Sequence, residues 1–122
     1  MYVHPQQGQN NAEVQRLRKA AGRWLKTLRE TSGLSQRQLA DKVGLDYYTF
    51  ISQIESGRGR IPPERYGSFA KAYGIAPRPF VQELMRYYDP FTHDILFGTD
   101  ETAATSGSDD RKRGGAPAAN DG

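Results

Sequence analysis

Four residues that can hydrogen-bond to the edges of DNA bases lie close together near the middle of the chain. They are Tyr48, Thr49, Ser52 and Gln53. On a helix they lie opposite or beside the apolar positions of the same segment. The major groove admits a helix and presents a distinct donor and acceptor pattern for each base pair, and Gln53 can pair with adenine through both amide atoms. Taken alone, the pattern also fits an ordinary polar face in solvent.

Residues suited to phosphate stand on both sides of this segment. Gln36 and Arg37 are expected to begin a preceding helix, where free N–H groups and the dipole favour an anion. Arg58 and Arg60 follow the segment on a glycine-rich stretch, and arginine binds phosphate through paired hydrogen bonds. Ser56 completes the expected phosphate set. The polar face and the phosphate-binding residues on both sides of it together predict a docking surface for double-stranded DNA.

The preceding helix is predicted over about residues 36–43. Ser35 followed by Gln38 has the spacing of a capping box, in which each side chain satisfies a backbone N–H of the helix start. Leu34 and Leu39 have the spacing of a hydrophobic staple. Ser35 is therefore predicted to be the N-cap.

A turn and a second short helix are predicted to follow at once. Gly44 can adopt the left-handed conformation that ends a helix, and Asp46 is a suitable cap for a helix over about 47–56. Apolar side chains recur there at helical spacing and are expected to face the core: Tyr47, Phe50, Ile51 and Ile54. Two short helices joined at a glycine are typical of a helix-turn-helix.

Three more helices are predicted around this pair, over about residues 12–31, 62–73 and 77–88, which makes the ordered chain all-α. The first carries a basic face that is interpreted as solvated, with phosphate contact as the alternative: Arg16, Lys19, Arg23 and Lys26. Residues 1–11 and 99–122 have compositions typical of disorder. Within the second tail, Arg111, Lys112 and Arg113 form a basic cluster, interpreted as solvated rather than as a DNA-contacting arm.

Residues 89–98 form an apolar extension with no clear periodicity. With the end of the preceding helix it is a candidate dimer contact, and packing within one subunit is the alternative. The apolar residues of this candidate surface are Tyr87, Tyr88, Phe91, Ile95, Leu96 and Phe97.

The run from Gly33 to Leu45, followed by Ile51 to Gly57 and then a proline, resembles the phage-repressor/Cro type of helix-turn-helix found in Xre-like transcription regulators. The resemblance covers roughly residues 12–88. It implies a compact five-helix, lambda-repressor-like DNA-binding domain between disordered tails.

The resemblance also implies roles for individual residues. Gln36 would bind phosphate at the start of its helix. The base-reading positions would fall on Tyr48, Thr49, Ser52 and Gln53. An arginine late in the first helix pairs with a glutamate in some members, and these positions are Arg29 and Glu55. Glu55 is therefore interpreted as structural.

The sequence departs from the family pattern at one place. The segment from Gly44 to Ile51 is one residue longer than usual. When the recognition helix is aligned with the family pattern from its C-terminal end, the base-reading assignments of Ser52 and Gln53 are secure. The assignments of Tyr48 and Thr49 can each be displaced by one position. Tyr47 can face either the DNA backbone or the core.

Composition sets further bounds on the 122-residue chain, which has a net charge of +3 and no cysteine. Residues 1–98 carry +5, from 14 basic and 9 acidic residues, and residues 99–122 carry −2. This balance permits a polyanion partner without requiring one. No apolar run approaches the ~20 residues of a membrane span. We expect a cytoplasmic protein, associated with the nucleoid through DNA and with no membrane partner.

The expected function is that of a sequence-specific transcriptional regulator acting as a homodimer on a near-palindromic site, because one recognition helix buries too little surface for typical specific affinity. The alternative is an antitoxin that neutralises a protein partner and regulates its own promoter; the extension or tail could bind that partner. Catalysis is not expected, since His4 lies in the lead predicted to be disordered, His93 has no nearby metal-ligand companion, and the sequence has no Gly-x-x-x-x-Gly-Lys phosphate loop. No cofactor or metal is expected.

Overall fold

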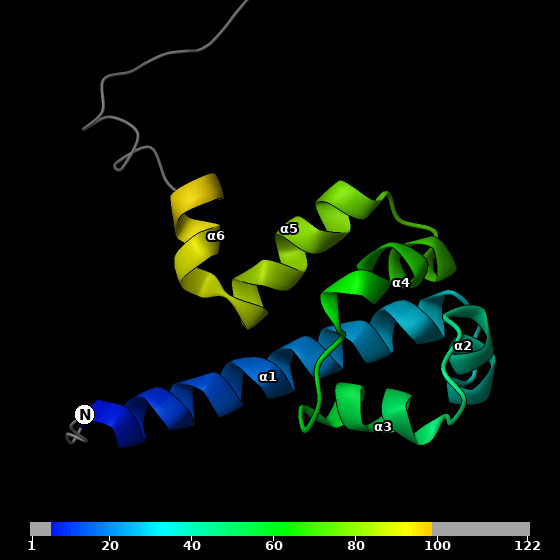
Figure 1. Cartoon of the computed structure of the whole chain (residues 1–122), viewed down its shortest axis with the longest axis horizontal. Helices are drawn as coiled ribbons and strands as arrows, with labels where there is room; N and C mark the ends of the chain where they lie inside the picture. Colours follow the sequence, from blue (N-terminus) through cyan, green and yellow to red (C-terminus); the bar gives the residue numbers. More distant parts are fainter. Residues whose placement is uncertain (1–5, 99–122) are drawn as a thin grey trace, which may run out of the picture. The chain divides into compact units, whose positions relative to one another are not determined.

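The computed structural model describes residues 6–98, and the expectations for residues 1–5 and 99–122 lie outside this range. Its regular structure is entirely helical (Figure 1), which confirms the all-α class. The described range contains six α-helices and a short 3₁₀ turn, Pro63–Arg65. The α-helices are α1 (Gln6–Thr31), α2 (Gln36–Lys42), α3 (Thr49–Ser56), α4 (Tyr66–Tyr73), α5 (Pro77–Tyr88) and α6 (Pro90–Phe97). Five were predicted, and α6 lies in the extension that showed no clear period.

Helix α1 begins at Gln6, six residues before the predicted start. Residues 6–11 are therefore helical, and the prediction of a disordered lead is wrong for them. A formed helix gains one hydrogen bond for each residue added, and three of these six residues are glutamine, which has a good helix propensity. The helix thus extends through polar sequence that has no apolar period of its own.

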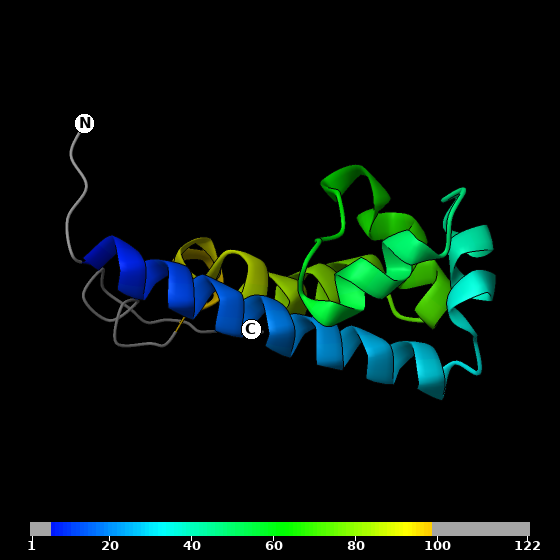
Figure 2. The same cartoon turned by 90° about the horizontal axis from the view of Figure 1, so that it is seen from below.

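The first unit of the chain, α1 to α5, has one hydrophobic core. Helix α1 lies against α3 and α5, and α2 lies against α3 and α4 (Figure 2). The largest fully buried side chains come from every part of this unit: Leu25, Leu39, Ile51, Ile61, Phe69, Phe80 and Leu84. Helices α2 to α5 have 12 residues or fewer and would be marginal in isolation, so the packing of their apolar faces around one centre is what holds them.

Two glycines allow α1 and the end of α3 to approach closely. A Cβ atom at Gly22 would lie 2.2 Å from the carbonyl oxygen of Glu55. A Cβ atom at Gly57 would lie 2.9 Å from the backbone nitrogen of Lys19, and Gly57 also has a left-handed backbone with φ of 87°. No larger residue fits at either position without a shift of backbone, so this crossing fixes where α3 sits on α1.

Helix α2 begins and ends as its sequence predicts. The Ser35 hydroxyl accepts a hydrogen bond from the Gln38 N–H at 3.0 Å, and the Gln38 side chain accepts one from the Ser35 N–H at 2.8 Å. Gly44 has φ of 74°, and the Leu45 N–H donates to the Ala40 carbonyl at 2.9 Å. The capping box and the glycine-ended turn are confirmed.

The start of α3 differs from the prediction. The helix begins at Thr49, and the cap position is Tyr48, without a side-chain hydrogen bond, so Asp46 is not the cap. Tyr47 is 66% exposed and Phe50 is 47% exposed. The expectation that Phe50 faces the core is therefore wrong, and of the two alternatives for Tyr47 the core is excluded: Tyr47 precedes the helix, and Phe50 lies about 100° around it from the buried Ile51.

Helix α6 belongs to a second unit that begins at Asp89. The Asp89 side chain caps it by accepting a hydrogen bond from the Thr92 N–H at 3.2 Å. Its large apolar side chains are exposed: Phe91, Ile95, Leu96 and Phe97. Within residues 6–98, no helix is long and apolar enough to cross a membrane.

Candidate nucleic-acid interface

The outer side of α3 is polar and open to solvent. Thr49, Ser52, Gln53 and Ser56 are all exposed. The inner side is held by Ile51 and Ile54, which are buried. Tyr48, just before the helix, is 40% exposed. The structure therefore brings the four expected base-reading residues to one accessible surface at the start and outer side of α3.

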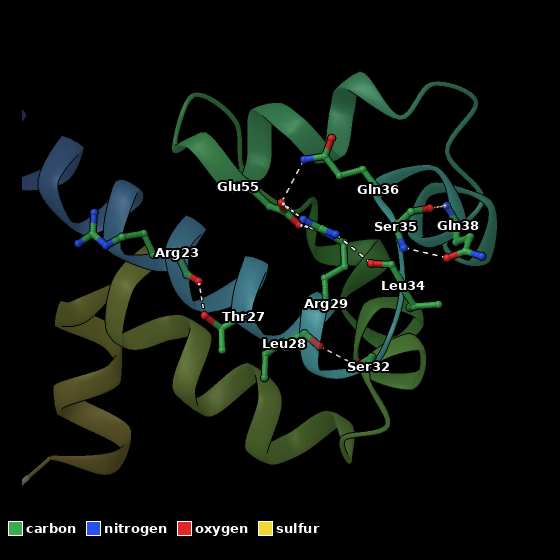
Figure 3. A network of polar contacts seen from close by, with 10 residues as sticks. All are labelled: Arg23, Thr27, Leu28, Arg29, Ser32, Leu34, Ser35, Gln36, Gln38 and Glu55. Carbon is green, nitrogen blue, oxygen red and sulfur yellow. Dashed lines mark hydrogen bonds and ion pairs between the residues drawn. The ribbon is translucent and has the colours of Figure 1, made fainter.

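A buried ion pair fixes the inner side of α3 to α1. The Arg29 Nε atom lies 2.7 Å from Glu55 Oε2, and Arg29 Nη2 lies 3.1 Å from Glu55 Oε1 (Figure 3). The side chains are only 10% and 5% exposed. Hydrogen bonding to Glu55 raises the pKa of the Arg29 guanidinium. Arg29 also donates to the Leu34 carbonyl at 2.9 Å, so the pair ties α1 to both the α1–α2 turn and α3.

The side chain of Gln36 joins this network. Its Nε2 atom donates to Glu55 Oε1 at 3.1 Å, and Figure 3 shows the amide reaching from α2 to the carboxylate. Gln36 is half-buried. Its amide nitrogen therefore has a structural partner within the protein. Contact of Gln36 with phosphate stays a prediction, and the network gives this residue a defined position at the start of α2.

Arg37 connects α2 to the approach to α3. Its guanidinium carbon lies 4.5 Å from the centre of the Tyr48 ring. A cation over an aromatic ring is attracted by the ring's negative face, which favours this contact by about 0.5–1 kcal/mol at an exposed site. Arg37 remains exposed. Arg37, which is predicted to bind phosphate, and Tyr48, which is predicted to read bases, thus contact each other.

The loop after α3 is anchored to the Gln53 backbone. The Gln53 carbonyl accepts hydrogen bonds from the N–H groups of Arg58 and Gly59, both at 3.0 Å. The Ser56 hydroxyl donates to the same carbonyl at 3.1 Å. The exposed Arg58 side chain therefore starts from a backbone position set by α3 itself.

Arg60 is placed differently from Arg58. Its guanidinium carbon lies 4.5 Å from the centre of the Tyr88 ring in α5. The Tyr88 hydroxyl accepts a hydrogen bond from the Ile61 N–H at 3.1 Å, and burial raises its pKa. Arg60 is exposed but already has an aromatic partner, whereas no such ring contact involves Arg58 within the described residues.

Two contributors to this surface, Gly22 and Arg65, were missed in the sequence, and a third, Gly57, was noted only as the end of the helix and of the family motif. Gly22 and Gly57 set the α1–α3 approach, and the Arg65 guanidinium donates to the Val43 carbonyl at the end of α2. A glycine inside a helical pattern is a usable signal, because it weakens the helix unless close packing requires it. Arg65 offered no comparable signal, since its partner is a backbone atom 22 residues away.

Two residues of the candidate dimer surface pack within one subunit. The Tyr87 ring lies 5.7 Å from that of Trp24, and Tyr88 bonds to Ile61 as described. These two tyrosines therefore fit the alternative given above for this surface, which is packing within one subunit. The four apolar residues of α6 remain as the exposed part of that surface.

The helix-turn-helix domain family matches residues 20–84, which include α2, the Gly44 turn and α3. The search of curated proteins found no match for this chain. The family match spans more than half of the sequence and coincides with the helices that carry the polar surface. The protein therefore belongs to the helix-turn-helix domain family, a family of DNA-binding regulators.

Proposed function

We propose that the protein is a sequence-specific transcriptional regulator of the Xre/Cro type that reads the major groove with α3. The observation that carries this proposal is the contrast within α3, whose outer side is a continuous exposed polar row and whose inner side is fixed by a buried ion pair. A recognition helix needs both, because base contacts require accessible donors and acceptors held at a defined position.

The residues divide by the part of DNA that they contact. Base edges are read by Tyr48, Thr49, Ser52 and Gln53. Backbone phosphates are bound by Gln36, Arg37, Ser56, Arg58 and Arg60. Phosphate contacts set orientation and supply affinity, and base contacts supply the choice of sequence.

Lys19 adds to the phosphate set. The backbone of Lys19 lies directly against Gly57, so its exposed side chain starts beside the loop that carries Arg58. This position supports the phosphate alternative for that one residue of the basic face of α1. Arg16 of the same face is paired instead with Glu13 at 2.6 Å.

Selection of bound DNA from a random pool, at a stated salt concentration, tests the proposed function. We expect a defined motif with two related half-sites about one helical turn apart. Binding without sequence preference, which falls away as salt rises, would refute specific regulation.

The proposed assembly is a homodimer formed through α6. Four large apolar side chains are exposed on this eight-residue helix, with Phe91 at 82% and Ile95 at 78%. Apolar surface concentrated in this way marks an interaction site. Light scattering should give the mass of two chains, and the double substitution Phe91→Ser with Ile95→Ser should give one. Loss of the dimer should weaken binding to a full site while half-site binding persists.

The second candidate function is that of an antitoxin, and the same exposed α6 is the observation that favours it. An apolar helix can equally be covered by a protein of different sequence. Co-expression with the product of an adjacent small gene distinguishes the two. A stable complex that is lost in the α6 double variant, together with a chain that is monomeric alone, would favour the antitoxin.

A further inference from the structure

Tyr47 and Phe50 form an exposed aromatic pair at the start of α3. Their ring centres are 6.2 Å apart and their planes are inclined by 51°, which is a favourable arrangement for two aromatic rings. They are 66% and 47% exposed. By contrast, Phe69 and Phe80 of the same unit are almost fully buried. The core does not use the aromatic pair, so its apolar surface is available to a partner.

The aromatic pair borders the polar row of α3. Phe50 lies one helical turn before Gln53, and residues three apart are neighbours on a helix surface. Tyr48, between the two rings in sequence, is held by Arg37 at 4.5 Å. A ligand that contacts Gln53 and Tyr48 together therefore meets the aromatic pair as well.

We propose that the aromatic pair recognises the 5-methyl group of thymine in the major groove. This inference rests on the proposed function, because it concerns the same DNA surface. The thymine methyl is the apolar feature that the major groove displays, and phenylalanine is among the side chains that contact it. The polar row supplies hydrogen bonds, and the aromatic pair supplies the apolar contact that distinguishes thymine from cytosine or uracil.

The position of the aromatic pair favours DNA over a protein partner. A protein covering Tyr47 and Phe50 would also cover Gln53, one turn away on the same helix. For a second chain, the proposed contact is the set of exposed apolar residues of α6. The aromatic pair and α6 are therefore assigned different occupants.

The test uses the selected DNA site with uracil placed at one thymine position at a time. Uracil keeps every hydrogen-bonding group of thymine and lacks only the methyl. Burial of one methyl-sized group is worth about 0.8 kcal/mol, so uracil should weaken binding of the unsubstituted protein about 4-fold at each contacted position. Phe50→Ala should bind the thymine and uracil sites equally there, and Tyr47→Ala should reduce the difference.

Matched variants keep the result interpretable. Val14→Ala removes an exposed apolar side chain from α1 and should retain the full preference for thymine. Phe50→Leu keeps an apolar side chain and should retain part of it, which covers the case in which Phe50→Ala fails to fold.

Two outcomes would overturn the inference while leaving the proposed function intact. One is a selected motif that the unsubstituted protein binds equally with thymine or uracil at every position. The other is a preference for thymine over uracil that persists in both Phe50→Ala and Tyr47→Ala. If these variants also lose the mass of the dimer in light scattering, the aromatic pair contacts a protein and not DNA. Failure to select any motif would instead refute the proposed function, and the inference with it.

Discussion

The two sides of α3 differ in how their residues are held: those on the inner side contact other parts of the protein, and those on the outer side face solvent. On the inner side each group has a specific partner: Glu55 bonds to Arg29 and Gln36, and the backbone of Glu55 touches Gly22. On the outer side, Ser52 and Gln53 are exposed. The inner side therefore admits few substitutions and the outer side many. Stability and DNA preference should respond to different residues of one eight-residue helix.

The largest expected effect comes from Glu55→Gln. It removes the negative charge but leaves the Arg29 guanidinium buried, and breaking a buried pair typically costs about 3 kcal/mol or more. Urea unfolding should show this loss in the free energy of unfolding. The base preference of the folded fraction should stay the same.

Glu13→Gln is the matched control for the ion pair. Glu13 also meets its arginine through two hydrogen bonds, but the side chains are 55% and 64% exposed. Exposed pairs contribute little, so its unfolding curve should match that of the unsubstituted protein. An unchanged melting temperature for Glu55→Gln, with an altered choice of DNA site, would contradict the division between the two sides.

The second largest effect is expected from Gly22→Ala. The added methyl would meet the Glu55 carbonyl at 2.2 Å, and relief of such overlap typically costs about 1–3 kcal/mol. Gly67→Ala is the control, because nothing lies within 4 Å of its added methyl and alanine favours helices. Thermal unfolding should place Gly22→Ala below the unsubstituted protein and Gly67→Ala at or above it. Equal melting of the two variants would show that α1 and α3 separate without penalty.

Gln53→Ala should act on the outer side alone. Loss of a bidentate contact should reduce discrimination at one base pair by about 1–3 kcal/mol. Repeated selection from a random pool should show one position of the motif becoming degenerate, with unfolding unchanged. A uniform loss at all positions would instead place Gln53 against the DNA backbone.

The smallest effect is expected from Arg58→Ala, which should weaken all sites alike. The plot of log affinity against log salt has a negative slope, and the magnitude of this slope should decrease by about 1, since one phosphate contact is lost. Arg78→Ala removes a similarly exposed arginine from α5, outside the proposed contact surface, and should leave the slope unchanged. Selective loss at a few sequences would transfer Arg58 to the base-reading group.

Local rules explain what the sequence could predict. The Ser35 and Gln38 capping box depends on residues three apart, and the structure forms it as expected. The left-handed turn at Gly44 is equally local. Both could be predicted because no distant part of the chain decides them.

The exposed positions of Tyr47 and Phe50 could not be predicted in this way. Spacing shows that apolar residues recur, but it does not show how wide a face the core will cover. Helix α3 contacts α1 and α2, and its buried apolar residues are Ile51 and Ile54, so Phe50 lies outside the covered face. Tyr47 lies outside it because the helix starts only at Thr49. Gly22 shows the same limit: a glycine inside a helical pattern indicates close packing, but the sequence does not show that the end of α3 is the segment that crosses it.

The hydrogen bonds that converge on the Gln53 carbonyl have a consequence for movement along DNA. They join the backbone of a base-reading residue to the loop that carries Arg58. In the proposed complex, the backbone positions from which one base contact and one phosphate contact extend are therefore held next to each other. A shift by one base pair would misalign both contacts together, so sliding would proceed by releasing and re-forming them as a unit.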